Sequence, residues 1–133
     1  MSTIIYHIER TITPSQLAGV FDRSGIKRPT GDLPRMAQML SRSDVLVTAW
    51  DDEELIGVAR SLTDFCFCCY MTDLAVDRAY QHIGIGKQLI ALTQNKIGPQ
   101  ATLLLIAAPS ATSYYPKVGF EAELNGWTIK RCQ

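Results

Sequence analysis

Two glycines and the residues around them form the stretch of this sequence that points most clearly to chemistry. Gly84 and Gly86 follow the apolar run Leu74-Ala75-Val76 and a polar connector, and an apolar repeat at helical spacing comes after them. This pattern predicts a strand, a glycine loop and a helix. The first N–H groups of a helix have no internal partner, and the helix dipole places partial positive charge there. Because glycine also lets a ligand approach the backbone closely, we expect an anion site, and phosphate is the usual ligand.

Two common phosphate motifs do not fit this loop. A P-loop would need glycine five residues before Gly86 and Ser or Thr after Lys87, but Gln81 and Gln88 occupy those positions. A dinucleotide fingerprint would need a third glycine at Leu89 and an acidic residue about 20 residues further on, where the sequence is apolar. An ordinary tight turn between a strand and a helix remains the alternative that needs no ligand.

The remaining pattern is Gln-x-x-Gly-x-Gly after a Leu-x-Val strand, and it resembles the acetyl-CoA signature of the GCN5-related N-acetyltransferase (GNAT) family. The resemblance implies that backbone N–H groups bind the diphosphate of acetyl-CoA and that its pantetheine arm lies along the strand. It implies that His82 offers its backbone, while Lys87 either lies near a phosphate or faces solvent. The acetyl-CoA-binding residues expected from the resemblance are Leu74, Ala75, Val76, Gln81, His82, Ile83, Gly84, Ile85, Gly86 and Lys87.

A second stretch, residues 111–120, carries two adjacent tyrosines and ends in Gly-Phe. It resembles the second landmark of the family, where the tyrosine four residues before the glycine lies beside the CoA sulfur and protonates the leaving thiolate. The resemblance therefore implies that Tyr115 is the catalytic general acid, with a packed aromatic side chain as the alternative, and that Tyr114 serves in packing. The family often has Asn seven residues before this tyrosine, but Ala108 stands there, so the contacts to pantetheine are less well specified.

No general base stands out in the sequence. Relatives often use Glu or His on the central strand, but Tyr70 and Thr72 are the residues expected to face the substrate, and both are poor bases. Asp73 is one residue away and is expected to point to the other face of the strand. The amine would then arrive neutral or deprotonate through water. The other acids considered are Asp64, Glu121 and Glu123.

Composition narrows the class of protein. The 133 residues suggest a single domain, 1–133, with 47% apolar and 20% charged residues, as is ordinary for a globular chain. Thirteen basic and thirteen acidic residues cancel, so nothing favours nucleic acid or an anionic membrane as a partner. The N-terminus lacks a signal-peptide pattern, and the longest apolar run, 103–108, is too short to span a bilayer. We therefore expect a cytoplasmic protein.

Four cysteines are present, and three of them lie in the stretch 65–70. Cys66 and Cys68 would share one face of a strand, so a metal site is conceivable, but no second pair of ligands accompanies them. We expect no metal, and we interpret these cysteines as small buried hydrophobic residues in a reducing cytosol.

The order of predicted elements is α+β: a mixed, mostly antiparallel central sheet flanked by helices. The resemblance to the GNAT family adds a splayed pair of parallel strands and extends over the whole chain. The predicted helices begin near 13–14, 32–33 and 84 and end, for the first and third, at 24–25 and 98, with short helical turns at 110–115. The predicted strands cover 3–9, 45–50, 55–62, 65–76, 102–107, 120–124 and 127–131, the last two joined by Asn125-Gly126.

These observations predict an acetyl-CoA-dependent N-acetyltransferase that acts on the primary amine of a small molecule. Acceptor selection is expected from residues 25–32, residues 65–70 and the Asn125-Gly126 hairpin. The alternatives are acetylation of a protein Lys or N-terminus, or a non-catalytic module that binds acyl-CoA as a sensor. A nucleotide-binding regulator is a weaker alternative, and a homodimer is compatible with the resemblance.

Overall fold

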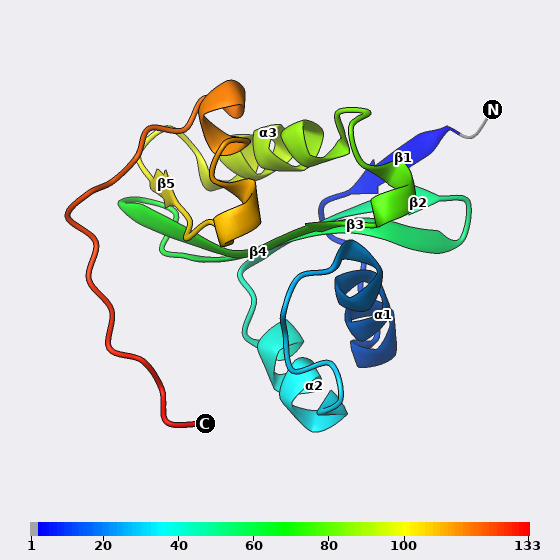
Figure 1. The fold of residues 1–133 in the computed structure, drawn as a ribbon. Coiled ribbons are helices and arrows are strands. Elements are labelled where there is room, and N and C mark those ends of the chain that lie inside the picture. Colours follow the sequence, from blue (N-terminus) through cyan, green and yellow to red (C-terminus); the bar gives the residue numbers. More distant parts are fainter. Residues whose placement is uncertain (1–2) are drawn as a thin grey trace.

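The computed structural model describes residues 3–133, whose strands form one sheet in the order β1-β2-β3-β4-β5 (Figure 1). Strands β1 to β4 are antiparallel to their neighbours, and β5 is parallel to β4. This confirms the predicted α+β class with a mixed, mostly antiparallel sheet. The elements are β1 (Ile4–His7), α1 (Pro14–Ser24), α2 (Leu33–Ser41), β2 (Val45–Asp51), β3 (Glu54–Thr63), β4 (Cys68–Val76), η1 (Arg78–Tyr80), α3 (Ile85–Ile97), β5 (Thr102–Leu104), η2 (Pro109–Ala111) and η3 (Tyr115–Val118).

Local capping signals set the helix boundaries where the sequence predicts them. The Thr13 hydroxyl accepts a hydrogen bond from the Gln16 N–H at 3.1 Å, and the Gln16 side chain accepts one from the Thr13 N–H at 2.9 Å. Gly25, with φ of 85°, ends α1, and the Asp32 side chain caps α2. No helix within residues 3–133 is long and apolar enough to cross a membrane.

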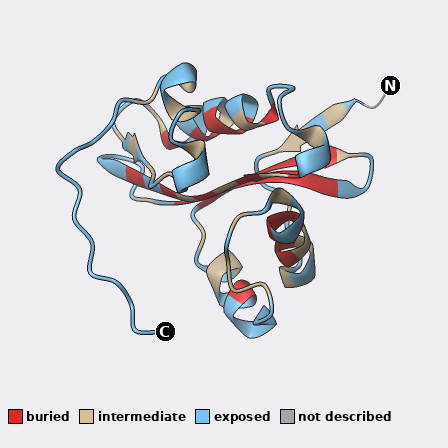
Figure 2. Ribbon diagram, in the orientation of Figure 1, coloured by how far each residue is buried: buried red, intermediate tan, exposed pale blue. Residues whose placement is uncertain are grey.

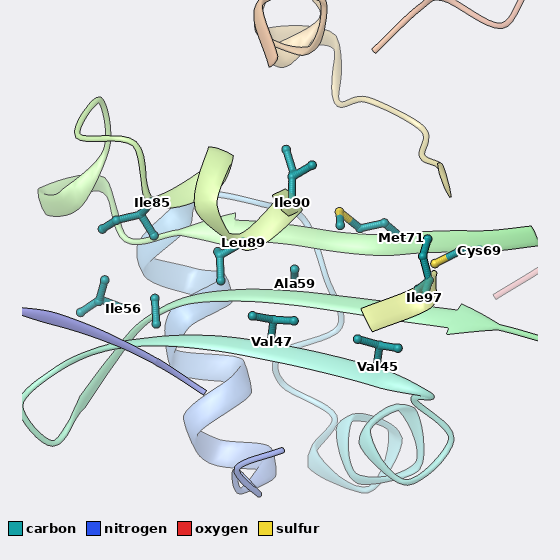
Figure 3. Close-up of a cluster of buried hydrophobic side chains, with 11 residues drawn as sticks. Val45, Val47, Ile56, Ala59, Cys69, Met71, Ile85, Leu89, Ile90 and Ile97 are labelled. Carbon is teal, nitrogen blue, oxygen red and sulfur yellow. The ribbon is translucent and has the colours of Figure 1, made fainter. Parts of the chain in front are cut away.

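Helix α3 covers one face of the sheet, and α1 and α2 cover the other (Figure 1). The buried residues concentrate in the middle of the sheet and on the inner sides of α1 and α3 (Figure 2). On the α3 side, four helix residues pack onto β2, β3 and β4 (Figure 3): Ile85, Leu89, Ile90 and Ile97. Each such fully buried side chain contributes about 1.5–3 kcal/mol of hydrophobic stabilisation.

A β-bulge in β4 decides which side chains face the second helical layer. Asp73 pairs with Arg60 of β3, while Met71 pairs with the next residue of β3, so Thr72 has no partner. Met71 packs on the α3 side, but after the bulge Asp73 lies on the face of α1 and α2, the same face as Tyr70. The expectation that Asp73 points away from the face of Tyr70 is therefore wrong, because simple alternation fails at a bulge.

The two strands predicted over 120–124 and 127–131 are absent. Residues 120–133 are irregular and mostly exposed, and the apolar Leu124, Trp127 and Ile129 are between 89% and 101% exposed (Figure 2). A turn does form at 124–125, but the neighbouring β5 has only three residues to pair with. An isolated two-stranded hairpin is marginal in water, so the predicted hairpin has too little support.

The strand predicted over 102–107 forms, but it is shorter than predicted. β5 ends at Leu104, and Leu104 and Ile106 are 47% and 66% exposed. Leu103 and Leu105 do pack toward the α3 side. Among residues 3–133, no helix covers the opposite face at this end of the sheet, so the run of apolar residues is buried on one side only (Figure 1).

A turn centred on Asp64 delays the start of β4, which was predicted at residue 65. One carboxylate oxygen of Asp64 accepts the backbone N–H groups of Cys66, Phe67 and Cys68 at 2.8–3.0 Å. As a result, Cys66 and Cys68 are exposed, against the expectation of burial, and only Cys69 is buried.

Close packing at Gly57 of β3 yields a first prediction. A Cβ at Gly57 would lie 3.2–3.3 Å from the side chains of Ile85, Ala49 and Leu89. We expect Gly57→Ala to lower the free energy of unfolding by about 1–3 kcal/mol through overpacking, measured by urea denaturation. Gly31→Ala is the matched control, since no atom lies within 4 Å of its Cβ position. Equal stability of the two variants would contradict this account of the core.

Candidate functional site

Strands β4 and β5 run side by side for a short distance and then separate. β4 continues to Val76, whereas β5 ends at Leu104, so residues 71–76 have no partner strand on that edge among residues 3–133. Unpaired N–H and C=O groups on a strand edge can bind an extended ligand that carries amides. The residue pairs before the separation are Cys68 with Thr102, Cys69 with Leu103, and Tyr70 with Leu104.

The glycine loop ends in a set of free backbone donors at the start of α3. Gly84, with φ of 89°, is the residue before the helix, and His82 has φ of 68°. The Gln88 N–H is the first to bond inside the helix, to the Gly84 carbonyl at 3.1 Å. Within residues 3–133 the N–H groups of residues 82–87 make no hydrogen bond, and the first turn has no acidic residue. The dipole and these donors together favour an anion here.

The predicted loop residues lie next to the free end of β4. The Gln81 side chain donates to the Val76 carbonyl at 2.9 Å, which fixes the loop against the strand. Ile85 is 2% exposed and anchors the helix start in the core, while Ile83 is 64% exposed. His82, Gly84 and Lys87 are also exposed, and no atom lies within 4 Å of a Cβ placed on Gly84. Open space therefore borders the free donors.

The three predicted strand residues divide between the two faces of β4. Ala75 is 3% exposed and belongs to the core under α1. Leu74 and Val76 are partly buried against the α3 side. Their side chains are thus used in packing, and their backbone is what remains for a ligand.

The two tyrosines of the second motif lie in different surroundings. The Tyr114 hydroxyl lies 2.7 Å from the position of a Cβ on Gly86, so Tyr114 packs directly against the first turn of α3. The Tyr115 ring packs edge-on against Tyr114 and Phe120, with centroid distances of 5.2 and 5.4 Å. Burial raises the pKa of Tyr115 above its ordinary value, Tyr114 adds to this, and the nearby positive charge of Arg28 acts in the opposite direction.

A partly buried cluster of two arginines and one aspartate, which the sequence analysis missed, fastens the loop between α1 and α2 to the bulge. Asp73, whose side chain is 1% exposed, accepts hydrogen bonds from Arg28 and Arg60, each at 2.5 Å. Arg28 also donates to the Thr72 carbonyl at 2.9 Å. An arginine in an otherwise apolar strand is a signal that a buried partner exists, but only the bulge at Thr72 reveals that this partner is Asp73.

The acidic residues considered as a general base differ in how readily their carboxylates could accept a proton. Asp73 is occupied by two guanidinium groups. Backbone N–H groups of Cys68, Cys66 and Phe67 lower the pKa of Asp64 to about 2, which makes its carboxylate a weak base. Glu121 and Glu123 are exposed in the C-terminal segment.

Comparison with known proteins identifies the family. The sequence matches the family model described as acetyltransferase (GNAT) domain over residues 20–126. This chain belongs to the GNAT acetyltransferase family. It is 36% identical over 80 residues to "GCN5-related N-acetyltransferase 2, chloroplastic" of Arabidopsis thaliana, an alignment that covers 56% of this chain and 30% of that protein. The chain thus spans about a third of the length of this curated relative.

Solved structures share the GNAT fold along nearly the entire chain. A GNAT-family acetyltransferase from Streptococcus pneumoniae superposes with a TM-score of 0.77 at 21% identity, over 98% of this chain and all of the other. The aminoglycoside N-acetyltransferase AAC(6')-Iy, in complex with CoA, superposes with a TM-score of 0.72 at 20% identity, over 99% and 97% of the two chains. These similarities confirm the predicted GNAT fold.

The contact between Tyr114 and Gly86 in this GNAT chain can be tested directly. We expect Gly86→Ala to lower stability by about 1 kcal/mol, because the new Cβ meets the tyrosine hydroxyl. In a Tyr114→Phe background the nearest ring carbon would be 3.6 Å away, an ordinary contact, so the same substitution should be neutral or stabilising there. Urea denaturation of the four proteins in a double-mutant cycle measures the coupling, and equal costs in both backgrounds would contradict the contact.

Proposed function

We propose that this chain transfers an acetyl group from acetyl-CoA directly to the primary amine of a small molecule. The observation that carries the proposal is the row of free N–H groups at residues 82–87, adjacent to the unpaired edge of β4. Membership of the GNAT family and the CoA complex of a structural neighbour support the choice of an acyl-CoA.

The residues present fit the two polar parts of acetyl-CoA. The diphosphate needs donors and positive potential, which the N–H groups of residues 82–87 and the dipole of α3 supply. Gly84 leaves room for a close approach, since no atom lies within 4 Å of its Cβ position. The pantetheine amides need backbone partners, which residues 71–76 of β4 offer on their free edge. Ala108 contributes no side-chain amide, so backbone groups must supply this part of the binding.

The proposed reaction needs one acid and correct placement. Acetyl-CoA would supply the acetyl group as a thioester, and the amine nitrogen forms a C–N bond to its carbonyl carbon while the C–S bond breaks. Tyr115 donates its hydroxyl proton to the departing sulfur, and solvent takes the proton lost by the amine and restores that of Tyr115. Holding both reactants at attack distance replaces several kcal/mol of the barrier.

A small-molecule acceptor is favoured by the balance of charge over the chain, which provides no net electrostatic attraction for a strongly charged protein partner. Thirteen acidic and thirteen basic residues cancel over the chain. Aminoglycoside N-acetyltransferases among the structural neighbours act, by their names, on small-molecule amines. The cytoplasmic location and the homodimer stay predictions, and the Arabidopsis relative is named chloroplastic.

Tyr115→Phe tests the proposed acid. We expect kcat to fall about 100-fold, because general acid catalysis typically contributes 10²–10⁴-fold, while the Kd for CoA stays within twofold. Thiol release measures the first quantity and isothermal titration calorimetry the second. Tyr114→Phe is the control, with kcat expected within about threefold of the parent. Full activity of Tyr115→Phe would overturn this assignment, and CoA binding without turnover on any amine would instead indicate a non-catalytic acyl-CoA-binding module.

The pH profile gives a second test of the same residue. An acid acts only while protonated, and burial raises the pKa of Tyr115 above its ordinary value near 10. Loss of kcat through ionisation of Tyr115 should therefore begin only above about pH 10. We expect Tyr115→Phe to lack that alkaline descent, and an identical descent in the variant would assign it to another group.

A further inference from the structure

A cavity of about 550 Å³ lies on the face of the sheet opposite α3, at the end where β4 and β5 are paired. Cys69 and Met71 of β4 pack under α3, so Cys68 and Tyr70 project to the opposite face. The cavity floor is mostly apolar, and its principal lining residues are Leu62, Cys68, Tyr70 and Leu104, with Asp64 and Glu123 also lining it.

The cavity lies next to the point where β4 and β5 separate. Tyr70 and Leu104 line it, and they are also the last residue pair before β4 and β5 separate. The free N–H groups that we assign to the diphosphate lie in the glycine loop and the first turn of α3, and α3 covers the other face. A molecule in the cavity would therefore reach the gap between the strands from the side opposite the diphosphate.

The charges around the cavity favour a cation. Asp64 is ionised at neutral pH, since backbone N–H groups of Cys68, Cys66 and Phe67 lower its pKa to about 2. Glu123 is the second acid, and no Lys or Arg lines the cavity. An ammonium group is attracted to such a rim, whereas a carboxylate or phosphate is repelled.

We propose that this cavity is the acceptor site and that it takes a primary monoamine carried on an uncharged alkyl or aromatic body. This inference rests on the proposed N-acetyltransferase function. The hydrocarbon body packs on Leu62, Tyr70 and Leu104, and the two carboxylates draw in the ammonium group before it loses its proton. An aminoglycoside fits poorly, because its many hydroxyl and ammonium groups would face apolar side chains without hydrogen-bond partners.

A homologous series of n-alkylamines tests the apolar floor. With acetyl-CoA present, we expect kcat/KM to rise by about two- to fourfold per methylene from propylamine to hexylamine, since a buried methylene is worth about fourfold in affinity. Kanamycin and a lysine peptide should be poorer acceptors than hexylamine. A flat series, or a preference for kanamycin or the peptide, would overturn the inference.

Variants of the cavity lining, with a matched control, test whether the preference for longer alkylamines arises in the cavity. We expect Leu104→Gln and Leu62→Gln to flatten the alkylamine series and to weaken hexylamine binding to the CoA-loaded protein about tenfold, as measured by calorimetry. Ile5→Gln on β1, at the opposite edge of the sheet, is the control, because Ile5 is 49% exposed and Leu104 is 47% exposed. An equal effect of Ile5→Gln, or no effect of the two cavity variants, would overturn the assignment.

A pair of variants tests whether the carboxylate of Glu123 attracts the amine to the cavity. Glu123→Gln should raise the KM for hexylamine severalfold at low ionic strength and less at high salt, because salt screens exposed charges. Glu121→Gln, two residues away and outside the cavity lining, should leave KM unchanged. Equal responses of the two variants would remove Glu123 from the site.

Failure of the inference differs from failure of the proposed function. Turnover of kanamycin or the lysine peptide without turnover of alkylamines leaves the acetyltransferase function intact and overturns only this acceptor class. No turnover with any amine, in a protein that binds CoA by calorimetry, overturns both. Binding of hexylamine that depends on Leu62 and Leu104, together with the rising series, supports both.

Discussion

The candidate site depends on the unequal pairing of β4 with its two neighbouring strands. This strand of nine residues pairs with β3 from Cys69 to Val76 but with β5 over only three residue pairs. Backbone N–H and C=O groups need partners. The carbonyls of Thr72 and Val76 accept hydrogen bonds from the side chains of Arg28 and Gln81, and the remaining groups on the free edge at residues 71–76 are met by water or by a ligand. The chain then returns through η1 and starts α3 with further free N–H groups at residues 82–87. A ligand with both amides and a diphosphate meets the two deficits together.

The bulge at Thr72 changes which side chains of β4 face α1 and α2. It turns Asp73 toward α1 and α2, where Arg28 and Arg60 enclose it. The Arg60 side chain is 9% exposed and the Arg28 side chain 28%, so breaking the Arg60 pair approaches the cost of about 3–5 kcal/mol typical of a buried ion pair, and the partly exposed Arg28 pair costs less. Two guanidinium groups on one carboxylate also leave a net positive charge next to the separating strands. That charge acts on Tyr115, the residue proposed to develop negative charge during transfer.

The sequence predicts well those features that local chemistry determines. The capping box at Thr13, the glycine end of α1 at Gly25 and the start of α3 after Gly84 all depend on residues within one turn of the boundary. The resemblance to the GNAT family likewise rests on short motifs. After Leu104 the predicted helical turns near 110–115 are present, but the predicted strands at 120–124 and 127–131 are absent. Strand pairing there depends on a distant partner edge and not on the Asn-Gly turn itself.

The ion pair between Arg28 and Asp73 could not be predicted from the sequence for the same reason. Arg28 and Asp73 are 45 residues apart, and their meeting requires a bulge that no residue pattern announced. Period-two alternation placed Asp73 on the wrong face, since one unpaired residue inverts every later side chain in the strand. An anion site at the glycine loop could be predicted from the sequence because its expected donors are backbone N–H groups, which every residue except proline carries. Side-chain roles need the register, which only the structure supplies.

The surroundings of Tyr115 connect these features to the proposed chemistry. A general acid must keep its proton at the pH where the attacking amine has begun to lose its own, and an alkylamine has an ordinary pKa near 10.4, close to that of a free phenol. Packing against Tyr114 and Phe120 buries the Tyr115 ring and raises its pKa, which widens the pH range in which acid and amine are both in the required state. Arg28 opposes this shift, but its charge would stabilise the phenolate that the proposed proton transfer produces. In the proposed reaction, burial would keep the proton on the Tyr115 oxygen before transfer, and the positive charge of Arg28 would compensate for its departure.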